Sequence, residues 1–243
     1  MSSGTPSPRF DGKLAVVTGV GRAGQVGEAV ARRFGELGAR VALLARTADD
    51  AHARAEELRR DGIDATPYAC DLADVTAVAA VARTVAGRNG GRVDALANIA
   101  GGFAAGGPVA DGDPAAWQHM FTINVATAYG ATHAMLPALR AARGAIVLVA
   151  AAAVLPGGKV AGIGAYAASK AAVIALMRTV AQEERPHAVR ANALAPTAIR
   201  TATNLDSMGS AFHYVERETF ANMVAFLCSA AAVNVNGQVI ELA

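Results

Sequence analysis

The chain has 243 residues, of which 53% are hydrophobic, 5% aromatic and 17% charged, and its formal net charge at pH 7 is +2. This length and composition suit one α/β domain with a large core of small aliphatic side chains. The basic residues are scattered along the chain and form no stripe, which argues against a nucleic-acid-binding protein and against a membrane-surface protein.

Residues 1–9 are polar and rich in Ser, Pro and Gly. We expect them to form a flexible N-terminal tail before one domain over residues 10–243. They lack the apolar stretch of a signal peptide, and no apolar run in the chain reaches the roughly 18 residues of a membrane span. We therefore expect a cytoplasmic protein. Cys70 and Cys228 have no CxxC spacing and are expected to be small buried side chains.

Short apolar segments alternate with longer segments of helical periodicity, a pattern typical of βαβ units around a parallel sheet. The near-continuous hydrophobicity of these segments, as in AIVLVA, indicates strands covered by helices on both faces. We predict a single-domain, Rossmann-type α/β fold with a doubly wound, seven-stranded parallel sheet, whose strands are Leu14–Thr18, Val41–Ala45, Ala65–Ala69, Ala95–Asn98, Ala145–Ala150, Arg190–Ala195 and Gln238–Leu242.

Three predicted helices have recognisable ends. The first ends at a glycine, the second has an aspartate N-cap with proline in its first turn, and the third ends near a proline. Their predicted extents are about Gly27 to Leu37 before Gly38, Asp113 and Pro114 through Trp117 toward Leu139, and about Ala165 to Glu184 before Pro186.

The first predicted strand leads directly into the glycine-rich segment TGVGRAGQVG, Thr18 to Gly27, and then into a helix. Glycines allow a sharp turn and a close approach to a pyrophosphate, and the helix N-terminus offers free N–H groups and the positive end of the helix dipole. In this strand–turn–helix context the segment predicts a dinucleotide-binding loop. The cofactor contacts expected in the loop are Gly19, Arg22, Gly24, Val26 and Gly27.

The end of the second predicted strand indicates which dinucleotide is bound. A carboxylate there would bind the ribose 2′-hydroxyl of NAD, whereas this chain has Ala45 followed by Arg46. The guanidinium of Arg46 can pair with the 2′-phosphate of NADP(H), and Arg22 can add a second positive charge. We therefore expect NADP(H) in preference to NAD(H), with ordinary solvated surface as the alternative interpretation of each arginine.

Together with this loop, the later motifs resemble those of the short-chain dehydrogenase/reductase family, in the family's order and over nearly the whole chain. These motifs are CDLAD, ANIAGG, FTINVATAYG, YAASK and NALAPTAIRT. The resemblance implies an oxidoreductase with a carbonyl or alcohol substrate and an active site of Asn124, Tyr166 and Lys170. It also implies cofactor contacts at Asp71, Leu72, Asn98, Ala100, Tyr166, Lys170, Pro196, Thr197, Ile199 and Thr201.

The chemistry of Tyr166 and Lys170 can also be argued from their spacing. Residues four apart lie on the same face of a helix, so the phenol and the ammonium can share one site. A free tyrosine has a pKa near 10, and a nearby ammonium is expected to lower the pKa of Tyr166. Tyr166 could then donate a proton to a carbonyl oxygen while NADPH delivers hydride to the carbonyl carbon. The resemblance adds that Lys170 holds the nicotinamide ribose and that Asn124 anchors a water.

The chain departs from the family at the serine that follows the fifth strand. No serine or threonine lies between Gly144 and Tyr166, and the family's serine position falls on Ala151 or Ala153, depending on the direction of counting. Loss of one preorganised donor to an oxyanion typically costs about 10²–10³ in rate. Three interpretations stay open: a slow enzyme with a replacement donor, a substrate with its own orienting group, or an NADP(H)-binding protein without turnover. Non-redox chemistry on the same scaffold is a further alternative.

Two loops also differ from the family. The glycine loop is about two residues longer than usual, so the individual roles of Gly24 and Val26 stay open. The segment from about Ala202 to Glu218, where the family has its substrate lid, is short, and its pocket candidates are Met208, Phe212, His213 and Tyr214. A metal role for His213 lacks a second ligand at useful spacing, and we expect no metal site.

The resemblance also implies association between copies of the chain. Family members commonly form dimers or tetramers through two long helices, which correspond here to the segments around Trp117–Leu139 and Ala165–Glu184. We expect a homo-oligomer, a dimer or a tetramer with the tetramer preferred, with a small-molecule substrate and no nucleic-acid or membrane partner.

Overall fold

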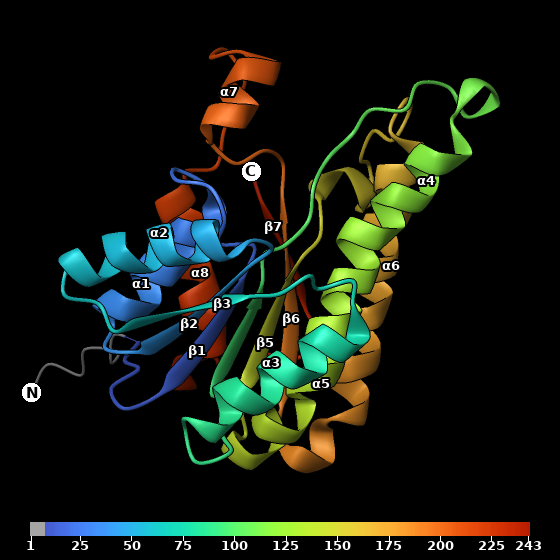
Figure 1. Cartoon of the computed structure of the whole chain (residues 1–243). Helices are drawn as coiled ribbons and strands as arrows, with labels where there is room; N and C mark the ends of the chain where they lie inside the picture. Colours follow the sequence, from blue (N-terminus) through green and yellow to red (C-terminus); the bar gives the residue numbers. More distant parts are fainter. Residues whose placement is uncertain (1–7) are drawn as a thin grey trace, which may run out of the picture.

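The apolar segments pair side by side in a seven-stranded parallel sheet with the order β3-β2-β1-β4-β5-β6-β7 (Figure 1). The structure is a computed structural model that describes residues 8–243, so most of the predicted tail lies outside the described residues. The strands are β1 Leu14–Thr18, β2 Arg40–Ala45, β3 Ala65–Ala69, β4 Ala95–Asn98, β5 Ala145–Val149, β6 Arg190–Pro196 and β7 Val239–Leu242.

The predicted fold is confirmed, and the strand boundaries agree within one residue. β1, β3 and β4 match their predicted extents, while β2 begins earlier at Arg40 and β6 continues to Pro196. β5 ends at Val149 and β7 begins at Val239. Nearly all residues of β1, β2, β4, β5 and β6 are buried, as expected for strands with helices on both faces.

Helices cover both faces of the sheet and enclose two separate apolar cores. Figure 1 shows α1, α2 and α8 on one face and α3, α5 and α6 on the other. The helices are α1 Val26–Glu36, α2 Ala48–Arg60, α3 Val75–Gly87, α4 Pro114–Phe121, α5 Thr127–Ala142, α6 Gly164–Glu183, α7 Ala202–Met208 and α8 Arg217–Cys228.

The core next to α1 begins close to the predicted domain start. Phe10 is fully buried and packs edge-to-face on Phe34 of α1, with ring centroids 5.0 Å apart. Cys70 and Cys228 are both buried and free, as predicted. Over residues 8–243, no helix has the length and apolarity that a bilayer crossing needs.

The helical stretch predicted from Pro114 toward Leu139 is present and contains one feature that the sequence did not indicate. Asp113 caps α4, accepting hydrogen bonds from the N–H groups of Ala115 and Ala116, as expected. Thr122–Ala126 then form a π-helical turn between α4 and α5. Such turns insert one extra residue into the helical ladder and are frequent at functional sites.

Candidate active site

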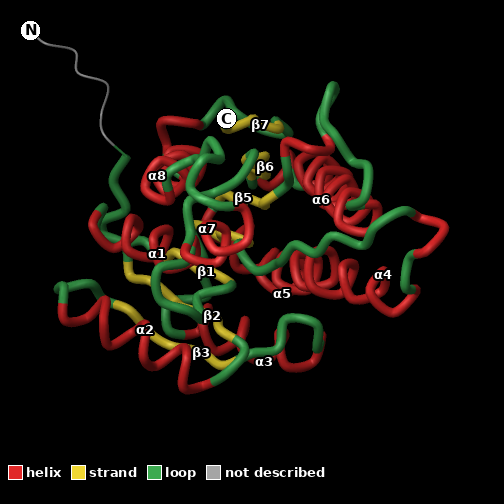
Figure 2. Tube along the Cα trace, turned by 90° about the horizontal axis from the view of Figure 1, so that it is seen from above, coloured by secondary structure: helices red, strands yellow, loops and turns green. Residues whose placement is uncertain are grey.

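Most of the predicted cofactor contacts lie at or just after the carboxyl ends of the parallel strands, which meet at one edge of the sheet, whereas Asn124, Tyr166 and Lys170 lie in helical segments. The strand order reverses between β1 and β4, where ligands of open α/β sheets bind. Figure 2 looks down on this edge and shows α7 above it, in the region between α1 and α6.

Two glycines shape the loop from β1 to α1. Gly19 has a φ of +73°, and a Cβ on it would lie 2.8 Å from the Cα of Ala100, just after β4. A Cβ on Gly27 would overlap the carbonyl oxygen of Gly19. Both positions therefore require glycine, and they bring the start of α1 against the ends of β1 and β4.

Thr18 fixes the junction between β1 and the end of β4. The sequence pattern assigned Thr18 only to the end of the first strand. Its hydroxyl accepts hydrogen bonds from the N–H groups of Ile99, at 3.0 Å, and Ala100, at 3.1 Å. It also donates to the carbonyl of Ala97 at 3.4 Å. Thr18 thus ties β1 to the end of β4, on which the glycine loop rests. The position of Thr18 at the start of TGVGRAG is the sequence feature that could have indicated this role.

The N-terminus of α1 has the character of an anion site. Its N-cap, Gln25, makes no side-chain capping hydrogen bond, so N–H groups of the first turn are left for a ligand. Arg22 and Arg46 are exposed, and neither forms an ion pair within residues 8–243. The described residues thus fit a dinucleotide phosphate at the loop and a further phosphate after β2.

The predicted adenine and β4 positions lie at the same edge. Leu72 is buried, and exposed Asp71 accepts a hydrogen bond from the N–H of Ala73. Asn98, the last residue of β4, donates to the hydroxyl of Thr132 on α5 at 2.9 Å. Asn98 therefore braces the central strand against its covering helix.

The segment after β6 leads to α7. Pro196 ends β6, and exposed Thr197 donates its N–H to the carbonyl of Leu242. Ile199 is buried and pairs with Val215. The hydroxyl of buried Thr201 accepts a hydrogen bond from the N–H of Asn204 at 3.2 Å and so caps α7.

Asn124 lies in the π-helical turn and is almost fully buried. Its side chain accepts from the N–H of Gly102 at 3.0 Å and donates to the carbonyl of Gly102 at 3.1 Å. The same amide donates to the hydroxyl of Ser169 at 3.1 Å. Ser169, which precedes Lys170, is fully buried and was missed by sequence reasoning, although it is part of YAASK. It links Asn124 to the helix that carries Tyr166 and Lys170.

Lys170 extends from α6 to the end of β5. It is buried, and its Nζ donates to the carbonyl of Val149 at 2.8 Å. Burial lowers the pKa of Lys170 to about 8, because a low-dielectric environment disfavours the ammonium.

Lys170 should therefore make stability depend on pH. The unfolded chain holds this proton up to a pKa of about 10.5, whereas the folded chain releases it above about 8. The free energy of unfolding then rises with pH across this window, and the contribution of Lys170 increases by about 2 kcal/mol between pH 7.5 and pH 10. Urea unfolding of the wild type and Lys170→Met at both pH values should show this difference. Exposed Lys159→Met serves as the control, and equal pH dependence in all three proteins would contradict the assignment.

Tyr166 departs from the expected behaviour. Its half-buried ring lies 4.9 Å, centroid to centroid, from the ring of Phe103 in an edge-to-face contact. Burial raises the pKa of Tyr166 to about 12. The Nζ of Lys170 is 5.9 Å from the ring centroid of Tyr166 and donates to Val149. The expected lowering of the tyrosine pKa by this ammonium is thus wrong for this structure, because desolvation dominates.

The loop after β5, on which the resemblance implies a serine in the family, is apolar in this chain. Ala150, Ala151 and Ala152 are buried, and Ala153 is half-buried. Within the described residues, the Tyr166 hydroxyl has no hydrogen-bond partner, and no side-chain hydroxyl stands between Gly144 and Tyr166. The sheet edge therefore offers one phenol for proton transfer without a second hydroxyl on this loop.

Of the four pocket candidates predicted between Ala202 and Glu218, one is buried and three are exposed. Tyr214 is buried, and its hydroxyl donates to the carbonyls of Asn204, at 3.1 Å, and Gly209, at 2.7 Å. It thus anchors α7. Met208, Phe212 and His213 are exposed. Among the residues described, no group of three or more His, Cys, Asp or Glu side chains could hold a metal ion.

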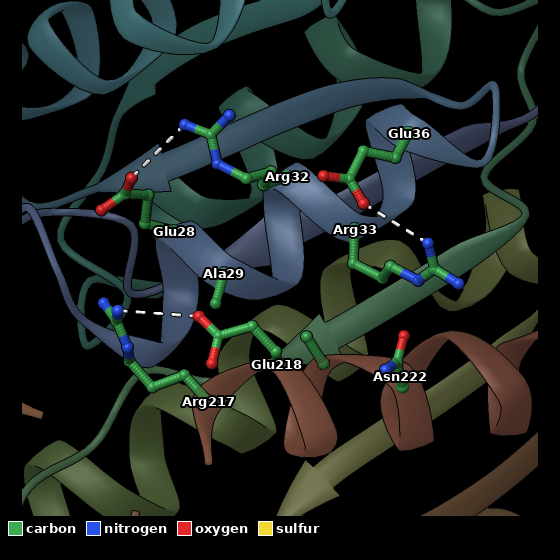
Figure 3. A pocket seen from close by; sticks show the side chains of 9 residues that line it. Glu28, Ala29, Arg32, Arg33, Glu36, Arg217, Glu218 and Asn222 are labelled. Carbon is green, nitrogen blue, oxygen red and sulfur yellow. Dashed lines mark hydrogen bonds and ion pairs between the residues drawn. The ribbon is translucent and has the colours of Figure 1, made fainter. Parts of the chain in front are cut away.

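A shallow groove of about 310 Å³ lies between α1 and α8, away from Tyr166 (Figure 3). Its lining alternates in charge, with Glu28, Arg32, Arg33 and Glu36 from α1 facing Arg217, Glu218 and Asn222 from α8. The groove is therefore polar and differs from the apolar pocket expected for a small-molecule substrate.

Comparison with known proteins identifies the class that this fold and site define. The family model described as short chain dehydrogenase matches residues 13–208. The chain belongs to this family, whose oxidoreductases use a nicotinamide dinucleotide.

Three similar proteins illustrate the range of the family. The D-threitol dehydrogenase of Mycolicibacterium smegmatis is 32% identical, over 94% of this chain and 90% of that protein. The sex determination protein tasselseed-2 of Zea mays is 35% identical, over 81% of this chain and 58% of that protein. The structure of a candidate NAD(P)-dependent gluconate 5-dehydrogenase from Beutenbergia cavernae, with bound NADP at low occupancy, has a TM-score of 0.84 and 32% identity, covering 96% of each chain.

Proposed function

We propose that this chain is an NADP(H)-dependent oxidoreductase that reduces a ketone or other carbonyl substrate, or oxidises the corresponding alcohol. The observation that carries the proposal is the meeting of Tyr166, buried Lys170 and the Asn124–Ser169 pair at the carboxyl end of β5. When bound, NADP(H) supplies or accepts the hydride.

The roles of the protein side chains follow from their environments. A phenol whose pKa is raised to about 12 stays protonated at neutral pH, so Tyr166 carries a proton that it can donate to a carbonyl oxygen. Lys170 places an ammonium next to the same space and would hold the nicotinamide ribose. Asn124 positions α6 through Ser169. In the alcohol-oxidising direction Tyr166 must instead act as a base.

The cofactor preference rests on charge. Exposed Arg46 follows β2 without a carboxylate at the strand end, and Arg22 lies in the glycine loop. Both are available for a 2′-phosphate. The presence of NADP in the Beutenbergia cavernae relative is consistent with this preference. The other proposed cofactor contacts are those named from the sequence between Gly19 and Thr201, except Gly24, whose N–H is bonded to Glu28.

Turnover tests the proposal. The protein is incubated with NADPH and a panel of ketones, diketones and quinones, and with NADP⁺ and polyols for the reverse direction, while absorbance of the reduced cofactor is followed. We expect consumption of NADPH with at least one carbonyl substrate. Stoichiometric cofactor binding without turnover on any substrate would contradict it.

The alanines after β5 favour a second candidate, an NADP(H)-binding protein without turnover, because no serine or threonine stands between Gly144 and Tyr166. A turnover abolished by Tyr166→Phe would exclude this candidate. Non-redox chemistry with Tyr166 as an acid would instead yield a product, identified by mass spectrometry, without oxidation of NADPH.

We also propose that copies of the chain associate through α5 and α6, as the resemblance implies. Trp117 and Tyr129 are exposed aromatic side chains on α4 and α5, which suits an interface between copies. Light scattering at micromolar concentration should give the mass of a tetramer, and a monomer would contradict this proposal.

A further inference from the structure

The glycine loop of this chain is about two residues longer than the family's, and its tip is held from outside the loop. The start of the loop is fixed because the N–H of Val20 donates to the carbonyl of Leu44 at the end of β2. Ala23 and Gly24 form the turn at the tip, and Gly24 has a φ of +69°. An exposed turn of this kind needs its own contacts to adopt one conformation.

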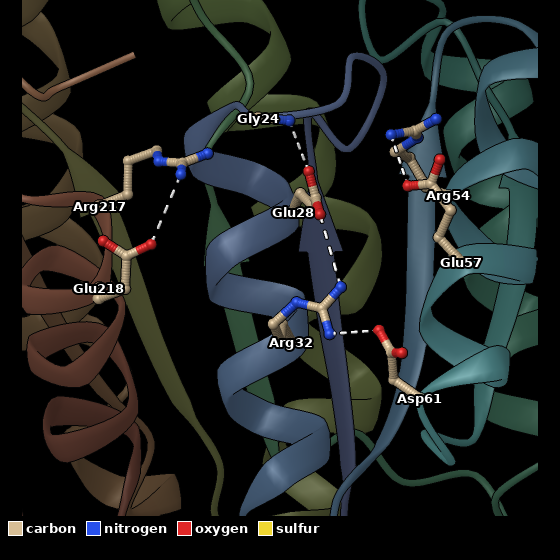
Figure 4. Close-up of polar contacts among 8 residues, drawn as sticks. All are labelled: Gly24, Glu28, Arg32, Arg54, Glu57, Asp61, Arg217 and Glu218. Atoms are coloured by element: carbon tan, nitrogen blue, oxygen red, sulfur yellow. Dashed lines mark hydrogen bonds and ion pairs between the residues drawn. The ribbon is translucent and has the colours of Figure 1, made fainter.

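Glu28 supplies the contact that holds the tip. Its Oε2 accepts a hydrogen bond of 2.6 Å from the N–H of Gly24 (Figure 4). Glu28 is the third residue of α1, and its side chain is 17% exposed. A glutamate at this position often returns to a backbone N–H before the helix, usually with a Ser or Thr N-cap as its reciprocal partner. Here the N-cap is Gln25, which makes no such bond.

Arg32 lies near the Glu28 carboxylate, and Arg217 lies near Gly24. The Nη2 of Arg32 lies 3.6 Å from its Oε1, and the Nη1 of Arg32 lies 2.6 Å from Asp61 at the end of α2. Arg217 of α8 approaches from the other side, with its Nη1 3.5 Å from where a Cβ on Gly24 would lie. The Nη2 of Arg217 also lies 3.6 Å from the Oε1 of Glu218, so both guanidinium groups are shared with other carboxylates and offset only part of the repulsion between Glu28 and a pyrophosphate.

The tip also reaches the lid. The side-chain amide of Gln25 lies 3.4 Å from the hydroxyl of Thr203 on α7, which it can donate to. The conformation that Glu28 selects is therefore the one in which the loop contacts both the start of α1 and α7.

We propose that Glu28 is a positioning residue for cofactor binding, whose carboxylate holds Gly24 so that the extended glycine loop receives the pyrophosphate in a preorganised form. This inference rests on the proposed function, because it assumes that NADP(H) binds at this loop. It also assigns Gly24 a structural role, since its N–H is already bonded to Glu28 and is not free for a phosphate.

Three variants distinguish the proposed positioning of Gly24 by Glu28 from an effect of the Glu28 charge and from a general loss of stability. Glu28→Ala removes the acceptor, and Glu28→Gln keeps an acceptor without the charge. Glu36→Ala removes another carboxylate of α1, whose one ion pair within residues 8–243 is with Arg33. We expect the Kd of NADPH to weaken about tenfold in Glu28→Ala and to stay within about threefold in Glu28→Gln and Glu36→Ala. At saturating NADPH, kcat should be the same in all of them.

Limited trypsin digestion gives a readout that is independent of the cofactor. Cleavage after exposed Arg22, followed by mass spectrometry of the fragments, should be several-fold faster in Glu28→Ala than in the wild type without ligand. Glu28→Gln and Glu36→Ala should resemble the wild type.

The outcomes are distinguishable. Wild-type affinity for NADPH in Glu28→Ala would overturn the positioning role alone, as would equal weakening in Glu28→Gln and Glu28→Ala. Failure of the wild type to bind NADPH or NADH would overturn the proposed function and, with it, the positioning role.

Discussion

Tyr166→Phe is expected to lower kcat for carbonyl reduction by about 10²–10⁴-fold, because it removes the proton donor and leaves the ring in place. The aromatic contact with Phe103 is kept, so the site should retain its shape. The Kd of NADPH should change less than about twofold, since the expected loss is confined to the chemical step. Steady-state kinetics with saturating NADPH, together with a binding titration, measures both quantities.

Tyr68→Phe is the matched control for this substitution. Tyr68 lies in β3, outside the proposed site, so its loss of a hydroxyl should leave kcat unchanged. Unaltered turnover in Tyr166→Phe would show that another group donates the proton and would remove Tyr166 from the proposed mechanism.

Restoring a hydroxyl after β5 is expected to raise activity. If the oxyanion lacks one donor, Ala151→Ser or Ala153→Ser should increase kcat by up to about 10²–10³-fold. Ala151 has an extended backbone at the end of β5, whereas Ala153 lies in the short helical turn that follows. The variant that responds identifies the position equivalent to the family's serine. Turnover with one carbonyl substrate at saturating NADPH compares them.

Ala152→Ser lies between the two positions and is the control for adding a hydroxyl to this loop. No gain from Ala151→Ser or Ala153→Ser in a protein that turns over would show that the pocket is organised around the alanines. In that case the donor comes from elsewhere, or the substrate carries its own orienting group.

Sequence patterns predicted the sheet well because each buried strand is a short apolar run with a glycine or polar boundary. β1, β3 and β4 agree to the residue. The π-helical turn at Asn124 could not be predicted, because the helical periodicity on both sides is continuous and only the contacts with Gly102 and Ser169 distinguish this turn.

The topology of a parallel sheet predicts that the site residues lie at one edge of the sheet. The burial and hydrogen bonds of each side chain could be learned only from the structure. The spacing of Tyr166 and Lys170 puts them on one helix face, but burial of each side chain decides the direction of both pKa shifts. The hydrogen bond from Gly24 to Glu28 is likewise a consequence of how the longer loop folds back on α1. The cytoplasmic location, the oligomeric state and the NADP(H) preference remain predictions.

Calorimetric titration of the purified protein with NADPH and then with NADH tests the central claim most directly. We predict one site per chain, with NADPH bound at least about tenfold more tightly than NADH because Arg46 and Arg22 pair with the 2′-phosphate. Tighter binding of NADH would contradict the assignment of the phosphate site. Absence of uptake of either dinucleotide by the folded protein would contradict the account as a whole.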